Sequence, residues 1–311
     1  MAWLRLIRWP NLLIIALTQF AAWWCVIWPS HKPEVLSPLN FLLLCLSTVL
    51  IAAGGYIIND YFDIRIDVIN KPDKVILERD IPRRLAIIVH SVLNVLAIVI
   101  ASLVALPAGH PEWLLLQVLC SFMLWRYSTA WKRQFVIGNL IVALMTALTV
   151  LVLIVYEPAL CRLLSAPALM YRSKFFWIIN PVYILSGFAF FAFTLTWMRE
   201  IVKDMEDFKG DAAEGCVTMP IKWGLLRSSR FVQMLAVITL LVLAYSSYRI
   251  WSLDLHDLDL VLYINIVMIP ALLIWMFRLP RKATMRHYHQ SSRQLKLIMV
   301  LGVIALLVYH Y

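Results

Sequence analysis

The sequence predicts an all-α membrane protein with about nine transmembrane helices in a single domain that covers residues 1–311. Of its residues, 62% are hydrophobic and only 15% are charged, whereas soluble domains average about 45–50% apolar and about 25% charged residues. The apolar residues form long unbroken runs, and a transmembrane helix needs roughly 20 such residues. A transmembrane β-barrel would instead alternate polar and apolar residues. The composition therefore excludes a soluble enzyme, and the runs exclude a barrel.

Nine apolar runs predict the helices, at residues 10–29, 39–58, 85–106, 112–130, 136–156, 175–198, 231–250, 258–278 and 295–311. Proline lies at or near several of the proposed ends, where helices commonly begin or stop, as at Pro29, Pro38 and Pro158. Arg5 and Arg8 precede the first run. This run is longer than the roughly 7–15 apolar residues of a signal peptide, so we expect it to remain as the first helix.

The positive charges predict how the helices are oriented. The N-terminus and the loops after even-numbered helices contain 23 of the 28 Lys and Arg residues. Short cytoplasmic loops carry such an excess, so we expect the N-terminus and these loops to face the cytoplasm from a cytoplasmic or inner membrane. The net charge of +10 is then a topology signal with some attraction to anionic membrane lipids. Because the basic residues lie in short loops and not in a basic domain, nucleic acid is not an expected partner.

The acidic residues are concentrated in two segments. Residues 60–80 and 200–214 hold 12 of the 18 Asp and Glu residues. The first segment follows the second predicted helix and the other follows the sixth, so both are expected on the cytoplasmic side. This spacing predicts two four-helix halves plus one further helix, with one acidic segment presented by each half.

Helical periodicity gathers the polar side chains of the first segment. If the second helix continues, Asn59, Asp63 and Asp67 fall within about 80° of one another, at about 100° per residue. Asp60 stands at the edge of this stripe. The segment is therefore expected to present one acidic face.

Four carboxylates of the second segment recur at helical spacing: Glu200, Asp204, Asp207 and Asp211. On one continuous helix they fall within about 60° of one another and form a single ridge. Like charges four residues apart destabilise a helix. A ridge of four carboxylates is therefore expected to bind cations.

The donor atoms of both segments favour hard cations. Oxygen ligands without nearby Cys or His indicate Mg²⁺, Mn²⁺ or Ca²⁺ and not zinc. Mg²⁺ takes one or two carboxylates and shares its other positions with waters and substrate phosphates. An acidic residue at a helix end is most often simply solvated, but two ridges at matched positions favour a metal and diphosphate site. Basic residues near the ridges are expected to complete it, among them Lys71, Lys74, Arg79, Lys132, Arg133 and Lys203.

At these two motifs the sequence resembles the UbiA superfamily of intramembrane prenyltransferases. That family has nine helices and the motifs N-D-x-x-D-x-x-x-D and D-x-x-x-D, which stand here at residues 59–67 and 207–211. The strings at 55–74 and 199–211 are most similar to one branch, the digeranylgeranylglyceryl phosphate synthases, and residues 127–139 resemble the family's fourth-loop pattern. After Asn70-Lys71-Pro72 that branch usually continues R-P-I-P-S-G, and this chain departs from it. The departure bears on the acceptor more than on the metal.

The resemblance implies Mg²⁺-dependent transfer of a prenyl group from an allylic polyprenyl diphosphate, such as geranylgeranyl diphosphate, to a lipophilic acceptor. The implied acceptor is the hydroxyl of a prenylglyceryl phosphate, and diphosphate is released. The residues that the resemblance assigns to Mg²⁺ and diphosphate are Asn59, Asp63, Asp67, Asp207 and Asp211, with Asp60 and Asp204 in support. Those that it assigns to phosphate are Lys74, Lys132 and Arg8. Tyr127 would face the allylic cation, because an aromatic face attracts positive charge, and Glu200 would be a catalytic or acceptor-orienting acid.

Two alternatives remain open. The same chemistry on an aromatic quinone precursor, or on another acceptor, is compatible with the same motifs. A cation-coupled transporter would also place carboxylates within a membrane protein. However, these carboxylates lie at the cytoplasmic ends of the predicted helices, and the sequence has no pair of Gly- or Pro-broken helices in matching halves. An enzyme is therefore the favoured class.

Overall fold

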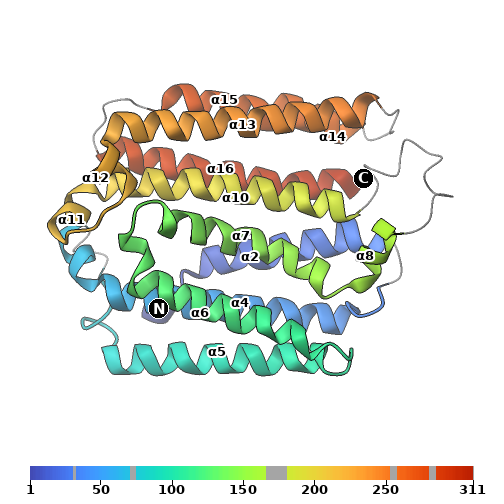
Figure 1. The fold of residues 1–311 in the computed structure, drawn as a ribbon, viewed down its shortest axis with the longest axis horizontal. Coiled ribbons are helices and arrows are strands. Elements are labelled where there is room, and N and C mark those ends of the chain that lie inside the picture. The colour runs from blue at the N-terminus through green and yellow to red at the C-terminus, as the bar shows by residue number, and fades with distance from the viewer. Residues whose placement is uncertain (31–32, 71–74, 166–180, 253–257, 280–284, 311) are drawn as a thin grey trace.

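In the computed structural model, the described part of the chain is a bundle of long, roughly parallel helices (Figure 1). The structure describes all residues except 31–32, 71–74, 166–180, 253–257, 280–284 and 311. Within these bounds the only β structure is one isolated bridge, between Leu77 and Ile81. The all-α prediction is therefore confirmed.

The first half of the chain supplies five of the long helices. A short α1 (Ala2–Leu6) leads into α2 (Trp9–Ala22), which continues through a π-helical turn (Trp23–Ile27) into α3 (Trp28–Ser30). The next long helices are α4 (Pro38–Asn70), α5 (Arg83–Ala105), α6 (Leu114–Thr129) and α7 (Ile137–Val155). A 3₁₀ turn, η4 (Trp131–Arg133), connects α6 to α7.

The second half supplies the remaining long helices together with several short ones. It contains α8 (Pro158–Ser165), α10 (Pro181–Glu206), α11 (Phe208–Ala213), α12 (Met219–Trp223) and α13 (Leu225–Ser252). A π-helical turn (Ile264–Met268) joins α14 (Leu258–Tyr263) to α15 (Ile269–Arg278), and α16 (Met285–His310) follows.

Eight helices of the described part are long and apolar enough to cross a membrane. The run predicted at 112–130 forms α6, which has 16 residues, fewer than the roughly 20 that span a bilayer. The predicted count of about nine helices thus holds, with this one shorter than the others. Large apolar side chains such as Leu103, Leu115 and Phe277 are exposed on the outside of the bundle, where a lipid environment would suit them.

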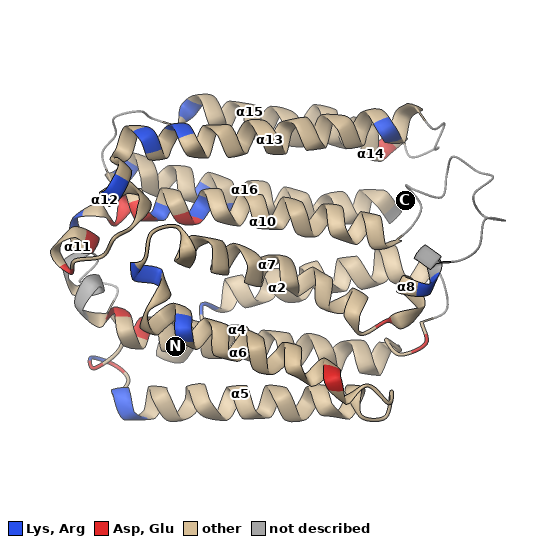
Figure 2. Ribbon diagram, in the orientation of Figure 1, with Lys and Arg blue, Asp and Glu red and all other residues tan. Residues whose placement is uncertain are grey.

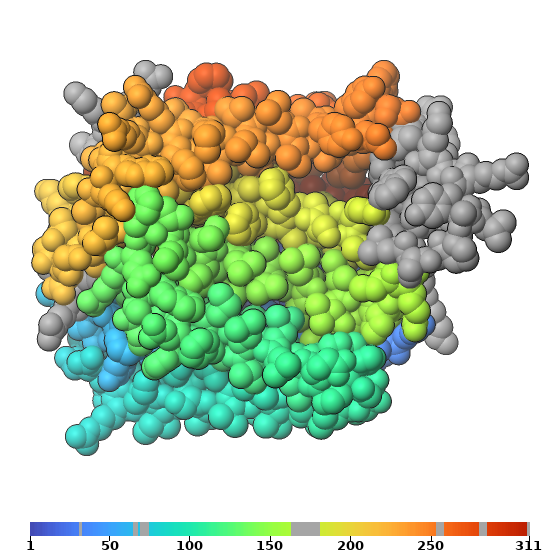
Figure 3. Space-filling view, in the orientation of Figure 1, coloured from blue at the N-terminus to red at the C-terminus, as the bar shows by residue number. Residues whose placement is uncertain are grey.

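The two helices that carry the acidic segments make most of the interhelical packing. In the first half, α4 packs against α2, α5 and α6, and in the second half α10 packs against α7, α13 and α16. On the face shown in Figure 3, side chains of α5, α6, α7, α10 and α13 cover the bundle. Both acidic segments emerge at the same end, beside α11 and α12, where charged residues gather in Figure 2. The packing therefore places the two segments opposite each other.

Close packing at Gly138 sets the position of the loop that contains Lys132. A Cβ atom on Gly138 would lie 2.6 Å from the Lys132 Cα and 3.0 Å from the Trp131 carbonyl oxygen. Real Cβ atoms do not approach backbone this closely, so only glycine lets η4 rest against the start of α7. The following loop is held in turn by the Val217 amide, which donates a hydrogen bond of 2.8 Å to the Arg133 carbonyl oxygen.

We expect Gly138→Ala to destabilise the protein by about 1–3 kcal/mol, as overpacking against fixed backbone does. The measurement is the midpoint of thermal unfolding in detergent. Gly187→Ala in α10 is the matched control, because no described atom lies within 4 Å of its added Cβ. Alanine is favoured over glycine in a helix by roughly 0.5–1 kcal/mol, so this control should be unchanged or more stable. Equal midpoints for Gly138→Ala and the wild type would contradict the packing argument.

Candidate functional site

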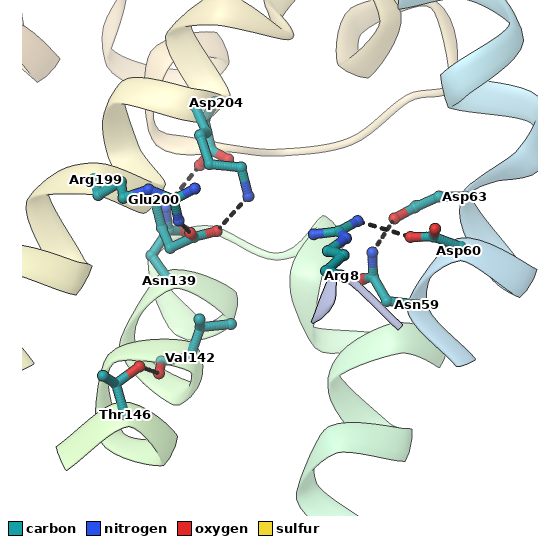
Figure 4. A network of polar contacts seen from close by, with 11 residues as sticks. Arg8, Asn59, Asp60, Asp63, Asn139, Val142, Thr146, Arg199, Glu200 and Asp204 are labelled. Atoms are coloured by element: carbon teal, nitrogen blue, oxygen red, sulfur yellow. Dashed lines mark hydrogen bonds and ion pairs between the residues drawn. The ribbon is translucent and has the colours of Figure 1, made fainter. Parts of the chain in front are cut away.

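A polar cavity of about 560 Å³ lies at the charged end of the bundle. Both acidic segments contribute to its wall, and so do α1, the turn between α1 and α2, α6 and η4. The sequence-predicted residues among its lining are Arg8, Asn59, Asp60, Asp63, Tyr127, Lys132, Glu200, Asp204, Asp207 and Asp211. The structure therefore brings together ten of the twelve site residues that the sequence predicts. Figure 4 shows Arg8 with the residues from α4 facing those from α7 and α10.

The remaining two predicted residues are only partly or not at all described. Asp67 lies on α4 one helical turn after Asp63, so the predicted continuation of this helix is confirmed for the backbone. The side chain of Asp67 lies outside the described part of the structure. Lys74 lies within the undescribed residues 71–74.

Basic and amide groups contact the carboxylates of the first segment. The Asn59 side-chain amide donates a hydrogen bond of 2.8 Å to Asp63 Oδ2, as the spacing of one helical turn predicts. The Lys132 ammonium forms an ion pair with the other oxygen of Asp63. Arg8 forms an ion pair of 2.7 Å with Asp60, and its guanidinium lies 5.1 Å from the centre of the Tyr56 ring.

The electrostatic surroundings of the two cations differ. Burial disfavours the charged form of Arg8, but Asp60, together with Tyr56 and Glu200, more than compensates, and the pKa of Arg8 is raised above its ordinary value. At Lys132, burial and the neighbouring Arg133 lower the pKa to about 7. A buried ammonium of this kind depends on an anion nearby, and Asp63 supplies one here. Lys132 is therefore placed to contact an anionic group at the first segment.

The second segment is not one continuous helix, and the predicted single ridge is wrong in this respect. Helix α10 ends at Glu206, and Asp207 has non-helical dihedral angles (φ −91°, ψ 9°) at the start of α11. The Asp207 amide donates the last hydrogen bond of α10, to the Lys203 carbonyl oxygen, and the Asp211 amide donates to the Asp207 carbonyl oxygen at 3.1 Å.

The break at Asp207 has a physical reason. A straight helix would carry four like charges at successive turns, which is unfavourable. The break instead packs α11 against α4, and Asp211 becomes buried. The carboxylates still line one cavity, so the predicted grouping is right although the predicted helix is too long.

Two further contacts organise the α10 side of the cavity. Asn139, buried on α7, donates a hydrogen bond of 2.8 Å to Asp204. Glu200 accepts a hydrogen bond of 2.9 Å from Arg199 and another of 2.9 Å from Lys203. Neither Asn139 nor Arg199 is among the site residues predicted from the sequence. For Asn139 the available signal was a single amide within an otherwise apolar helix.

The donor set fits a hard divalent cation such as Mg²⁺. Among the described residues no three Asp, Glu, His or Cys side chains already converge on one point. Several of the carboxylates instead contact the basic and amide groups named above. However, Asn59 Oδ1 is buried and has no hydrogen-bond partner among the described residues. Hard cations such as Mg²⁺ prefer oxygen ligands, and this amide oxygen lies beside the Asp63 carboxylate.

A second, apolar cavity of about 290 Å³ extends into the bundle from the polar one. Its wall comes from α2, α4, α6, α7, α10 and α16, and includes side chains such as Ile51, Leu124 and Phe191. Both cavities share the residues Arg8, Asn59, Tyr127, Glu200 and Lys203. A ligand at this junction can therefore place a charged group among the carboxylates and an apolar chain inside the bundle.

Comparisons with known proteins agree with this arrangement. The model of the UbiA prenyltransferase family matches residues 18–298. The digeranylgeranylglyceryl phosphate synthase of Sulfurisphaera tokodaii is 30% identical over 276 residues, which cover 88% of this chain and 87% of that protein.

Solved structures show the same fold. A structure reported with insights into digeranylgeranylglyceryl phosphate synthase in membranes aligns with a TM-score of 0.65 and 26% identity, covering 99% of this chain and 97% of that one. A UbiA homologue from Archaeoglobus fulgidus, bound to GPP and Mg²⁺, aligns with a TM-score of 0.59 and 16% identity, covering 98% of this chain and 99% of that one.

Proposed function

The chain belongs to the UbiA prenyltransferase family, and we propose that it prenylates a prenylglyceryl phosphate. It is an integral membrane enzyme that transfers prenyl groups. In the proposed reaction the donor is an allylic polyprenyl diphosphate, such as geranylgeranyl diphosphate, the acceptor is the glyceryl hydroxyl, and diphosphate is released. The observation that carries this proposal is the junction of a carboxylate-lined cavity with an apolar one. The acceptor is supported by the relatives named digeranylgeranylglyceryl phosphate synthase.

The two cavities suit the two ends of such a donor. A polyprenyl diphosphate has an apolar tail and a highly charged head. The tail gains free energy by leaving water for the apolar cavity, at about 25 cal/mol per Å² of apolar surface. The head lies in the polar cavity, where both acidic segments and the basic side chains are in reach. The reacting carbon then lies at the junction, beside Tyr127 and Glu200.

The acidic segments would hold the diphosphate through Mg²⁺. Bound Mg²⁺ supplies positive charge that neutralises the charge developing on the departing diphosphate. Asn59, Asp63, Asp67, Asp207 and Asp211 are the proposed ligands. Asp60 and Asp204 support this set through their contacts with Arg8 and Asn139. Lys132 and Arg8, with Lys74, provide direct contacts to the phosphate oxygens.

The residues at the junction serve the step after the C–O bond breaks. The allylic cation needs an environment that stabilises positive charge and excludes water, and the face of the Tyr127 ring meets the first need. The apolar wall meets the second, because exclusion of water prevents hydrolysis of a reactive intermediate. We assign the orientation of the acceptor hydroxyl to Glu200, and its position in the lining of both cavities supports this role.

The charged end of the bundle is proposed to face the cytoplasm. The N-terminus, α11 and α12 lie at this end (Figure 1), together with most of the Lys and Arg residues in Figure 2. Cytoplasmic loops carry such an excess of positive charge. A water-soluble diphosphate product would then leave on the cytoplasmic side.

We expect Asp63→Asn and Asp207→Asn each to lower Mg²⁺-dependent diphosphate release by about a hundredfold or more. Each substitution removes a proposed metal ligand, and metal stabilisation of developing charge contributes several kcal/mol. The assay uses purified protein in detergent with geranylgeranyl diphosphate and geranylgeranylglyceryl phosphate. Asp259→Asn is the control, because Asp259 is exposed on α14 at the opposite end of the bundle. Near-normal release by either variant at wild-type stability would refute the metal assignment.

Labelling of cysteines tests the proposed orientation. Cys161 on α8 is exposed and lies at the end away from α11 (Figure 1). A membrane-impermeant maleimide should therefore label Cys161 in intact cells. In a Cys161→Ser background, Glu78→Cys, which replaces an exposed side chain near the polar cavity, should be labelled only after the membrane is permeabilised. The reverse pattern would place the polar cavity on the outer side.

A further inference from the structure

Two basic side chains, Arg199 and Lys296, line the apolar cavity, where charged residues are not expected. Arg199 is on α10 and Lys296 is near the middle of α16. The charged residues that line the cavity are Arg8, Arg199, Lys203, Lys296 and one acid, Glu200. Ionisable residues within membrane-spanning helices are costly and usually have a function. Four cations facing one carboxylate therefore indicate a place for an anion.

The contacts of Arg199 and Lys296 leave much of their hydrogen-bonding capacity unused. The Lys296 ammonium donates a hydrogen bond of 2.5 Å to Asn11 Oδ1, which is a neutral acceptor, and it forms no ion pair with any described carboxylate. Arg199 forms an ion pair with Glu200, but its Nε is buried without a hydrogen-bond partner among the described residues. A buried donor without a partner is costly.

The acids near this cluster are already shared. Glu200 pairs with both Arg199 and Lys203, and Arg8 pairs with Asp60 in the polar cavity. Glu200 can neutralise only one of its two cationic partners, Arg199 and Lys203. The other positive charge, and that of Lys296, are therefore not neutralised by these acids. A phosphomonoester carries a charge of about −1.5 to −2 at pH 7. Its negative charge would neutralise these cations, and its oxygen atoms would accept hydrogen bonds from their unused donors.

We propose that Arg199 and Lys296, assisted by Asn11, bind the phosphate of the acceptor, at a site separate from the one that binds the diphosphate of the donor. This inference rests on the proposed function. The reaction brings two anionic lipids into one pair of cavities, where their like charges repel. The acidic segments bind the diphosphate only with a metal, whereas Arg199 and Lys296 bind the phosphate directly. The two cavities thereby hold the two head groups apart and leave the acceptor hydroxyl at their junction.

The test measures binding of the acceptor alone, without donor and with EDTA in place of Mg²⁺. Detergent-solubilised protein is titrated with geranylgeranylglyceryl phosphate, with unphosphorylated geranylgeranylglycerol and with phosphatidic acid. We expect the wild type to bind the phosphorylated acceptor at least about tenfold more tightly than either of the others. Lys296→Met and Arg199→Gln should each remove most of this preference. Lys296→Arg should keep it, and so should Arg293→Gln, which removes an exposed charge three residues earlier on α16.

The same variants separate recognition of the phosphate from a structural role. In the turnover assay, Lys296→Met should raise the KM for the phosphorylated acceptor about tenfold while the KM for geranylgeranyl diphosphate stays constant. If Lys296→Met weakens binding of the phosphorylated and the unphosphorylated glycerol lipid equally, or if it lowers the unfolding midpoint and raises both KM values, Lys296 is structural and the inference is wrong. If the wild type binds phosphatidic acid as tightly as the acceptor, the cluster is a site for bilayer lipid and the inference is also wrong.

Failure of the proposed function gives a different result. In that case the wild type releases diphosphate in the presence of an aromatic quinone precursor and not with geranylgeranylglyceryl phosphate. Tight, phosphate-dependent binding in the EDTA titration would then still demonstrate the anion site. Absence of this binding, with an active enzyme, would overturn the inference itself.

Discussion

The carboxylates at the end of this membrane-embedded bundle repel one another, and the basic and amide groups of the site compensate that repulsion. Seven acidic residues of the two segments line one cavity, and nothing in an apolar interior would keep such charges together. In the structure, Lys132 and Arg8 contact the first segment, and Lys203, Arg199 and Asn139 contact the second. These cations and amides compensate the negative charge of the carboxylates in the protein itself. We propose that a metal-bound diphosphate displaces them when it binds.

Helix packing determines where the carboxylates and the basic groups that contact them lie. Helix α4 and helix α10 each contact three other long helices, so the ends of both are rigidly placed relative to each other. Gly138 allows the loop with Lys132 to approach the start of α7, and the break at Asp207 packs α11 against α4. The apolar cavity follows from the same packing, because it lies between these helices and opens at the acidic end. Binding of a lipid tail and binding of its charged head are therefore coupled by the bundle itself.

Much of the fold could be predicted from sequence because its strongest signals are local. Runs of apolar residues place the long helices, and a spacing of four residues predicts the contact between Asn59 and Asp63. The break at Asp207 could not be predicted in this way, since periodicity says only where side chains would fall on a helix that continues. Lys296 illustrates a different limit. In a count of charges it is one more basic residue of the cytoplasmic side, but tertiary packing places it near the middle of α16, facing the apolar cavity. Its partner Asn11 is 285 positions away in the chain.

We propose that the two acidic segments act together, through Mg²⁺, as one binding site for the donor diphosphate. The experiment compares midpoints of thermal unfolding with a non-ionising analogue, geranylgeranyl thiodiphosphate. A ligand that binds the folded protein raises its apparent stability, and the rise grows with the ratio of ligand concentration to Kd. We expect a clear rise when Mg²⁺ and the analogue are both present, a much smaller one with the analogue and EDTA, and none in Asp63→Asn or Asp207→Asn beyond the EDTA level. An equal rise with and without Mg²⁺ would show that the diphosphate binds without the carboxylates, and the two segments would then not form the donor site.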